Sequence, residues 1–199
     1  PETFRTPIGT QDVLPPQSAR WQALIVTFAG VAARFGYGLV HGPMFEDVAV
    51  FARLGAGTDI VRKEMYDFRD KGDRHLALRP EATASVVRAF AEHGPPVPWK
   101  AWYAGPMFRY ERPQKGRYRE FVQCDADTVG SDRPEADAEI IAMACEGLRA
   151  AGLDAGQAVV RVSNRKLFDG LFQAGGIEDA GQRLTALRAI DKFDRLGWE

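Results

Sequence analysis

The sequence lacks several features that would assign it to a specialised class of protein. It has two cysteines, Cys124 and Cys145, too few for a disulfide framework and not at a metal-binding spacing. Charge or glycine interrupts every apolar stretch well before it reaches the length of a membrane span. The first residues show neither a basic start nor an apolar run, so no signal peptide is expected. These absences predict a cytoplasmic protein with reduced thiols and no membrane partner.

An excess of either charge is also missing. The formal net charge is −1 over 199 residues, so no whole-chain attraction to nucleic acid or membrane is expected, and any basic binding site must be local. The apolar content of 45% and the charged content of 27% are typical of a soluble globular protein. A chain of this length can form one large domain or two small ones.

The order of periodic segments predicts an α+β protein. Apolar residues recur at helical spacing from Trp21 to Phe35, and glycines follow where that helix should end. Short strand-like runs and hairpin signals interleave with the helices, which favours an antiparallel sheet with helices packed on it. The predicted helices are residues 17–35, 48–54 (closed by glycines at 55 and 57), 79–94, 134–152, 166–174 and 182–193, and the predicted strands outside the central stretch are residues 39–43, 64–69, 75–78 and 157–162.

The central stretch, residues 101–130, predicts two strands joined by a charged loop. Side chains alternate along a strand, so the second strand should carry polar side chains on one face and small, mostly apolar ones on the other. We expect the small face to pack against helices and the polar face to line a solvated space. The polar face comprises Arg119, Phe121, Gln123, Asp125 and Asp127, and the small face comprises Val122, Cys124, Ala126 and Thr128.

The loop of this hairpin is basic. Five basic and two acidic residues lie between Arg109 and Glu120. A basic loop beside a strand of carboxylates and an amide suits a ligand with phosphate at one end and cationic or hydrogen-bonding groups at the other. The alternative is the ordinary solvated face of an antiparallel sheet, without a ligand.

Three groups of residues resemble the catalytic core of class II aminoacyl-tRNA synthetases and, within that class, histidyl-tRNA synthetases. Residues 35–46, with Pro43, are similar to the first class motif, which forms the dimer interface. Phe108-Arg109-Tyr110-Glu111 followed by Arg117, Phe121 and Asp125 is similar to the second, ATP-binding motif. Leu78-Arg79-Pro80-Glu81-Ala82-Thr83 and the loop at residues 112–119 resemble the histidine-specific enzymes.

The resemblance implies amino-acid activation. The carboxylate of L-histidine attacks the α-phosphate of ATP, and the histidyl group then passes to tRNA(His). Arg109 is implied as the catalytic residue that stabilises charge on the α-phosphate and contacts the substrate carboxylate. Glu111 and Arg117 are implied at the adenine and γ-phosphate ends of ATP, and Phe121 as an aromatic platform for the base. Mg²⁺ is expected to bridge the phosphates, with its protein ligands unassigned.

The same resemblance implies the residues that bind histidine. Glu81 and Thr83, with Ala82 between them, resemble the segment that holds the α-ammonium group, and Asp127 and Gln123 resemble the pair that contacts the imidazole side. From the residues alone, simpler interpretations stay open. Glu81 can be an acid that stabilises the start of a helix, and Asp127 can be a surface strand residue.

The resemblance also sets expectations for the whole chain. Residues 1–199 correspond to the N-terminal part of a class II catalytic domain, without the third motif or the anticodon-binding domain. We therefore expect the chain alone to bind ATP and histidine weakly and not to charge tRNA, and we expect a homodimer. Two alternatives are a histidine-binding paralogue such as the regulatory subunit of ATP phosphoribosyltransferase, and an RNA-binding module whose basic loop contacts phosphates.

Overall fold

The computed structural model describes residues 3–53 and 63–196. The chain divides into two compact units, Pro1–Ala158 and Val159–Glu199. The first unit contains both β-sheets, and the second contains two helices. No helix within these described ranges has both the length and the apolar character needed to span a bilayer.

The predicted central hairpin is confirmed. Strand β5 (Trp99–Phe108) pairs antiparallel with β6 (Glu120–Val129) along its whole length. The strand expected at residues 39–43 is shorter and earlier: β1 (Gly38–Leu39) pairs parallel with β5 and forms the edge of this three-stranded sheet. The sheet is therefore mixed, and the antiparallel hairpin dominates it.

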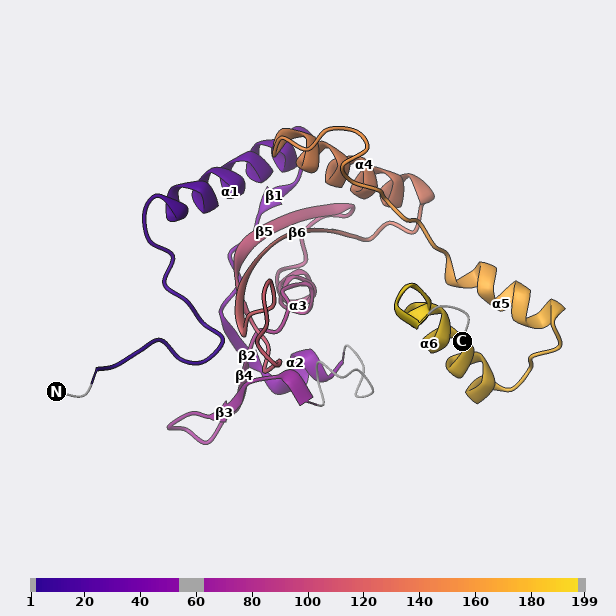
Figure 1. Cartoon of the computed structure of the whole chain (residues 1–199), viewed down its shortest axis with the longest axis horizontal. Coiled ribbons are helices and arrows are strands. Elements are labelled where there is room, and N and C mark those ends of the chain that lie inside the picture. The colour runs from indigo at the N-terminus through magenta and orange to yellow at the C-terminus, as the bar shows by residue number, and fades with distance from the viewer. Residues whose placement is uncertain (1–2, 54–62, 197–199) are drawn as a thin grey trace. The chain divides into compact units, whose positions relative to one another are not determined.

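Helices cover both faces of this sheet (Figure 1). Helices α1 (Gln17–Arg34) and α4 (Pro134–Ala150) lie side by side over one face, and α3 (Thr83–His93) lies over the other. Alternation along β5 explains how two cores form, because Trp102 packs with α1 and α4 whereas Tyr103 packs with α3. The helices at residues 17–35, 79–94 and 134–152 are thus confirmed, with boundaries shifted by at most four residues.

A second three-stranded sheet has β4 (His75–Leu78) at its centre, between β2 (Phe45–Asp47) and β3 (Asp67–Arg69). The predicted hairpin of β3 and β4 is confirmed, although its first strand begins at Asp67 and not at residue 64. Its turn is closed by Asp70, whose carboxylate accepts hydrogen bonds from the backbone of Gly72 and Arg74. Strand β2 was not predicted, because three residues are too few to show an alternating pattern. Helix α2 (Val48–Ala52) follows it, and the predicted last residue, Leu54, and the closing glycines at 55–57 lie outside the described residues.

Arg79 joins the two sheets. Its backbone N–H donates to the carbonyl of Met44, at the start of β2, and its carbonyl accepts from Phe108, at the end of β5. Its buried side chain donates from Nε to the carbonyl of Pro106 at 2.9 Å and from Nη1 to that of Gly42 at 3.2 Å. The guanidinium fits because position 105 is glycine: a Cβ there would lie 2.5 Å from Arg79 Nη2.

The second unit contains α5 (Arg165–Ala174) and α6 (Ala180–Leu196), which confirm the two helices predicted after residue 165. The strand predicted at residues 157–162 is wrong. Gln157 lies in a turn and donates to the carbonyl of Asp154, and Val159, Val160 and Val162 are exposed in irregular backbone. The run of β-branched residues favoured a strand, but no strand in the described residues pairs with it.

Candidate functional site

The first turn of α3 forms one wall of the candidate site. Glu81 precedes the helix, and its two carboxylate oxygens accept hydrogen bonds from the backbone N–H of Thr83 at 2.7 Å and of Ala84 at 2.9 Å. Glu81 therefore does stabilise the start of a helix, and each oxygen still has a second lone pair for a ligand. Ala82 is buried in the core with Val86, so any ligand contact from Ala82 must come from its backbone.

Thr83 connects this wall to β6. Its Oγ1 lies 3.2 Å from Oδ1 of Asp127 and 3.4 Å from the hydroxyl of Tyr103. An ionised carboxylate can only accept hydrogen bonds, so Thr83 donates to Asp127 and the Tyr103 hydroxyl donates to Thr83. Burial raises the pKa of Tyr103, which keeps this hydroxyl protonated. The three side chains form a directed chain of hydrogen bonds that ends on Asp127.

Asp127 is not a surface strand residue. Helix α3 covers its end of β6, and the side chain is largely buried. Burial, followed by the neighbouring charges of Asp125 and Glu81, raises the pKa of Asp127 from 3.8 to about 6, although the hydrogen bond from Thr83 opposes this change. The second oxygen, Oδ2, is buried without a hydrogen-bond partner among the described residues. A buried acceptor of this kind requires a proton or an external donor.

Gln123 lies on the same face of β6 and, like Asp127, has a buried oxygen without a hydrogen-bond partner among the described residues. Its Nε2 donates to Oδ2 of Asp125 at 2.9 Å, whereas its Oε1 is buried and also lacks a partner in the described part of the chain. Two unsatisfied acceptors thus lie on one face of the strand. The face is half-buried from Phe121 to Val129, so it is only partly open to solvent along its whole length.

Arg109 lies between the helix wall and the strand. Its Nε donates to the carbonyl of Pro80 at 2.8 Å, and its guanidinium carbon lies 5.1 Å from the centre of the Phe121 ring. This cation–π contact and the hydrogen bond fix the plane of the guanidinium. The terminal amino groups of Arg109 make no hydrogen bond within residues 3–53 and 63–196, so they remain to bind a ligand.

The loop between the strands pairs its charges internally. Oε2 of Glu111 lies 2.8 Å from Nη1 of Arg117, and the glutamate side chain is 15% exposed whereas the arginine is 53% exposed. The turn itself is closed by a bridge between Gln114 and Arg117, with Gly116 at a φ of +78°. The structure therefore brings Glu111 and Arg117 into direct contact.

Comparison with known proteins identifies the family. The family model described as histidyl-tRNA synthetase matches residues 9–196. The chain belongs to the histidyl-tRNA synthetase family. A histidine–tRNA ligase of Mycobacterium marinum is 44% identical over 203 residues, which cover 96% of this chain and 48% of that protein. The chain thus spans about half the length of that relative.

Solved structures of the histidyl-tRNA synthetase family share the fold. The apo histidyl-tRNA synthetase of S. aureus is 36% identical with a TM-score of 0.64, over 76% of this chain and 36% of that one. A protein of Bacillus halodurans C, described as an ATP phosphoribosyltransferase regulatory subunit/histidyl-tRNA synthetase, is 25% identical with a TM-score of 0.68, over 77% of this chain and 40% of that one. These similarities confirm the predicted α+β, class II synthetase fold.

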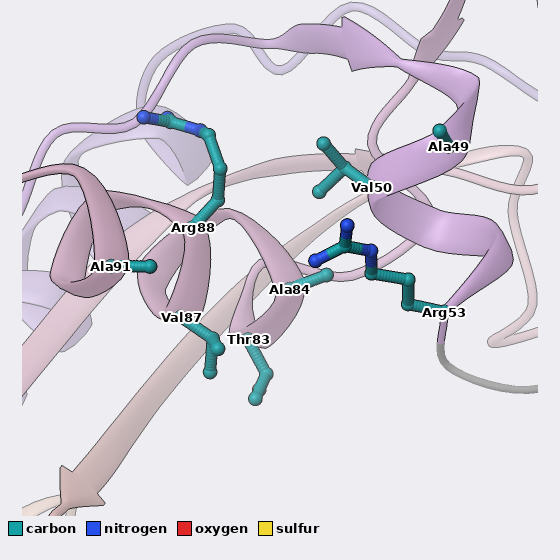
Figure 2. A pocket seen from close by; sticks show the side chains of 8 residues that line it. All are labelled: Ala49, Val50, Arg53, Thr83, Ala84, Val87, Arg88 and Ala91. Atoms are coloured by element: carbon teal, nitrogen blue, oxygen red, sulfur yellow. The ribbon is translucent and has the colours of Figure 1, made fainter.

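A pocket that the sequence did not predict adjoins the site of this family member. It has a volume of about 410 Å³ and lies between α2 and α3 (Figure 2). Arg53, at the end of α2, extends toward α3, whereas Arg88 bonds Glu46 and Glu92. Thr83 lies at the rim, so it borders both the pocket and the polar cluster of Asp127. The lining residues are Ala49, Val50, Arg53, Thr83, Ala84, Val87, Arg88 and Ala91.

Tyr103 is the site residue that sequence reasoning missed. It was assigned only to an apolar strand, and its hydroxyl becomes informative only through the register of the hairpin, which places Tyr103 opposite Asp125. Alternation along β5 could have placed Tyr103 on the α3 side, but the partner strand's register was not evident from the sequence.

Proposed function

We propose that this chain is part of a histidine–tRNA ligase, which activates L-histidine with ATP and transfers the histidyl group to tRNA(His). Membership of the family supports the proposal, as does the 44% identity to a histidine–tRNA ligase. The activity belongs to the whole protein, because the chain spans about half the length of that relative.

The observation that carries the proposal is the unpaired oxygen of Asp127. A ring N–H of histidine would donate to Oδ2 and satisfy the one acceptor that the protein leaves open at this carboxylate. An amino acid without a donor at that point would leave the acceptor buried and unpaired, at a cost of about 1–3 kcal/mol. This penalty would distinguish histidine from apolar amino acids of similar size.

The other groups of the site suit the rest of an amino acid. The free lone pairs of Glu81 and the hydroxyl of Thr83 would accept from the α-ammonium group, and the backbone at Ala82 places them side by side at the start of α3. Gln123, through its unpaired Oε1, would accept a further N–H. All these groups are acceptors, which matches a ligand that is rich in donors.

Arg109 would perform the electrostatic part of the reaction. One histidine carboxylate oxygen attacks the α-phosphorus, the bond from that phosphorus to the bridging oxygen of pyrophosphate breaks, and pyrophosphate leaves with the electron pair. Negative charge grows on the α-phosphate oxygens, and the terminal amino groups of Arg109 would stabilise it more in the transition state than in the ground state. The same groups would hold the carboxylate in line.

ATP would occupy the hairpin loop next to this site. Phe121 would offer its ring to the adenine, and Glu111 and Arg117 would bind opposite ends of the nucleotide. Because these two side chains are paired at 2.8 Å in the structure, ATP must separate them as it binds. Mg²⁺ would accompany the phosphates; the described residues contain no group of three or more metal-ligating side chains, and no ligand is assigned.

We further propose a homodimer that pairs through α1 and the segment ending at Pro43. The N-terminal part of α1 leaves Trp21 38% exposed and Leu24 54% exposed, next to Val122 on β6. A specific interface should bury more than about 1,000 Å². Sedimentation of the full-length protein at micromolar concentration tests this, and a monomer would contradict it.

Histidine-dependent ATP–pyrophosphate exchange by the full-length protein tests the proposed activity. Asp127→Asn should lower kcat/KM for histidine roughly 10- to 100-fold, because the amide cannot supply the same acceptor. Asp132→Asn, an exposed residue close by in sequence, is the matched control and should leave the rate unchanged.

One alternative has a specific observation in its favour. The similarity to the Bacillus halodurans protein, which is described as a regulatory subunit/histidyl-tRNA synthetase, makes a histidine-binding regulator the second candidate. A regulator would bind histidine without supporting exchange. An RNA-binding module would instead bind RNA in a strongly salt-dependent way and ignore histidine.

A further inference from the structure

The segment before α1 contains a tight turn that the sequence gave no reason to associate with a site. Thr10 donates to the carbonyl of Pro7 twice, from its backbone N–H at 3.0 Å and from Oγ1 at 2.8 Å. Gly9, inside the turn, has a φ of +86°, a conformation that disfavours any residue with a side chain. The turn Pro7–Thr10 is called the leader turn below.

The leader turn binds the first residue of β6 and the residue before it. The carbonyl of Gly9 accepts hydrogen bonds from the backbone N–H of Arg119 at 2.7 Å and of Glu120 at 3.3 Å. The approach is so close that a Cβ at position 9 would lie 2.6–2.9 Å from three carbons of the Arg119 side chain. Position 9 therefore requires glycine both for its backbone conformation and for its contact.

Arg119 in turn holds the two ends of the hairpin loop together. Its carbonyl accepts from the N–H of Arg109 at 2.9 Å, and its Nε donates to the carbonyl of Glu111 at 3.1 Å. Its guanidinium carbon lies 3.9 Å from the centre of the Tyr110 ring, which packs edge-on against Tyr66. Arg119 thus contacts each of the three residues that lead into the loop.

We propose that the leader turn is a positioning element for the nucleotide loop, and that Gly9 is a positioning residue. Gly9 fixes the backbone and side chain of Arg119, and Arg119 is hydrogen-bonded to the backbone of both Arg109 and Glu111. The proposal rests on the proposed function, in which these residues contact ATP. The loop must open its Glu111–Arg117 ion pair to admit ATP. If Arg119 is held by the leader turn, Arg117 can move while Arg109 stays in place.

Gly9→Ala in the full-length protein tests the proposal. We expect KM for ATP in histidine-dependent exchange to rise about five- to tenfold, equivalent to about 1–1.4 kcal/mol, with KM for histidine changed less than twofold. Gly152→Ala is the matched control, because Gly152 has a φ of +93° but no atom within 4 Å of its added Cβ. It imposes the same backbone strain without the contact, and both KM values should stay unchanged.

A second measurement does not depend on activity. Amide hydrogen exchange at Arg119 and Glu120 should accelerate in Gly9→Ala and not in Gly152→Ala, because only the Cβ at position 9 clashes with Arg119 and moves the carbonyl of residue 9 away from these two N–H groups. Thr10→Val, which removes the Oγ1 hydrogen bond without adding a clash, should change exchange and KM for ATP in the same direction by a smaller amount.

Three results would overturn the proposal: parallel rises in both KM values, equal effects of Gly9→Ala and Gly152→Ala, or faster amide exchange with an unchanged KM for ATP. A wild-type protein without histidine-dependent exchange would count against the proposed function instead. In that case KM for ATP is replaced by the dissociation constant of ATP measured by calorimetry, with the same expected rise.

Discussion

Two parts of the β5–β6 hairpin differ in how their charged side chains are paired. In the loop, Glu111 and Arg117 pair with each other near the surface. At the far end of β6, Asp127 is half-buried beside a second carboxylate and receives one hydrogen bond from Thr83, and its other oxygen is buried without a partner among the described residues. The two regions are called the loop region and the strand region below.

The difference indicates where each region can be adapted to a ligand. In the loop region the Arg117 side chain is 53% exposed and can leave the ion pair for a nucleotide, whereas Glu111 is only 15% exposed and its carboxylate then needs another donor. A buried acceptor without a partner costs about 1–3 kcal/mol, so the strand region is destabilised until a donor arrives. Selectivity for the amino acid should therefore come from the strand region, and adaptability from the loop region.

The largest expected effect is at Arg109, which connects the two regions. Arg109→Lys in the full-length protein should lower the rate of adenylate formation roughly 10²-fold or more, because an ammonium group cannot reproduce a planar, two-pronged contact. Single-turnover adenylation checks this. Near wild-type kinetics would remove Arg109 from the mechanism and leave the two regions independent.

The next effect concerns stability in the strand region. The pKa of Asp127 is about 6 in the folded protein and 3.8 ordinarily, so the folded state binds more protons between these values and stability falls as pH rises through this window. A shift of this size corresponds to about 3 kcal/mol at most. Asp127→Asn should remove this pH-dependent loss of stability.

Urea unfolding of both proteins without histidine, from pH 4.5 to 7.5, measures this difference. The stability of Asp127→Asn relative to wild type should increase with pH and level off near pH 7. A difference that does not depend on pH would show that Asp127 titrates as an ordinary carboxylate, and the contrast between the regions would lose its basis.

Tyr103→Phe should have a smaller effect. It removes the first donor of the chain that ends on Asp127 and leaves the ring packed against α3. We expect KM for histidine to rise about threefold to tenfold, as for the loss of one hydrogen bond of about 1 kcal/mol, with KM for ATP unchanged. Equal changes in both KM values would mean that Tyr103 serves the core alone.

The smallest effect is expected in the loop region. A double-mutant cycle with Glu111→Gln and Arg117→Gln should give a coupling energy of about 1 kcal/mol for unfolding without ATP, because Arg117 is 53% exposed although Glu111 is mostly buried. Urea unfolding of the four proteins measures it. A coupling above about 2 kcal/mol would make the loop region as rigid as the strand region and would contradict its proposed opening.

Local features of the fold were predictable because their causes are local. The hairpin of β3 and β4 follows from the turn at Asp70, and the end of α3 follows from Gly94, which has a φ of +59°. The strand predicted at residues 157–162 failed because a run of valines reports a tendency, whereas a strand requires a neighbour.

The candidate site was predictable only as a set of residues. The family resemblance selected Glu81, Thr83 and Asp127, and the structure brings these three together at the start of α3. Their burial and their hydrogen bonds were not predictable. The burial of Asp127 depends on a helix formed more than thirty residues earlier, and the contact of Gly9 with Arg119 joins segments that no sequence pattern relates.

The packing of Arg79 between the two sheets has a consequence for how this sequence can evolve. The guanidinium occupies the space that a side chain at Gly105 would need, and it satisfies two carbonyls from different parts of the chain. A change at position 105 therefore displaces Arg79, and a loss of Arg79 removes the need for glycine at 105. A side chain at position 105 should therefore occur only where Arg79 has also been replaced, so the two positions should covary.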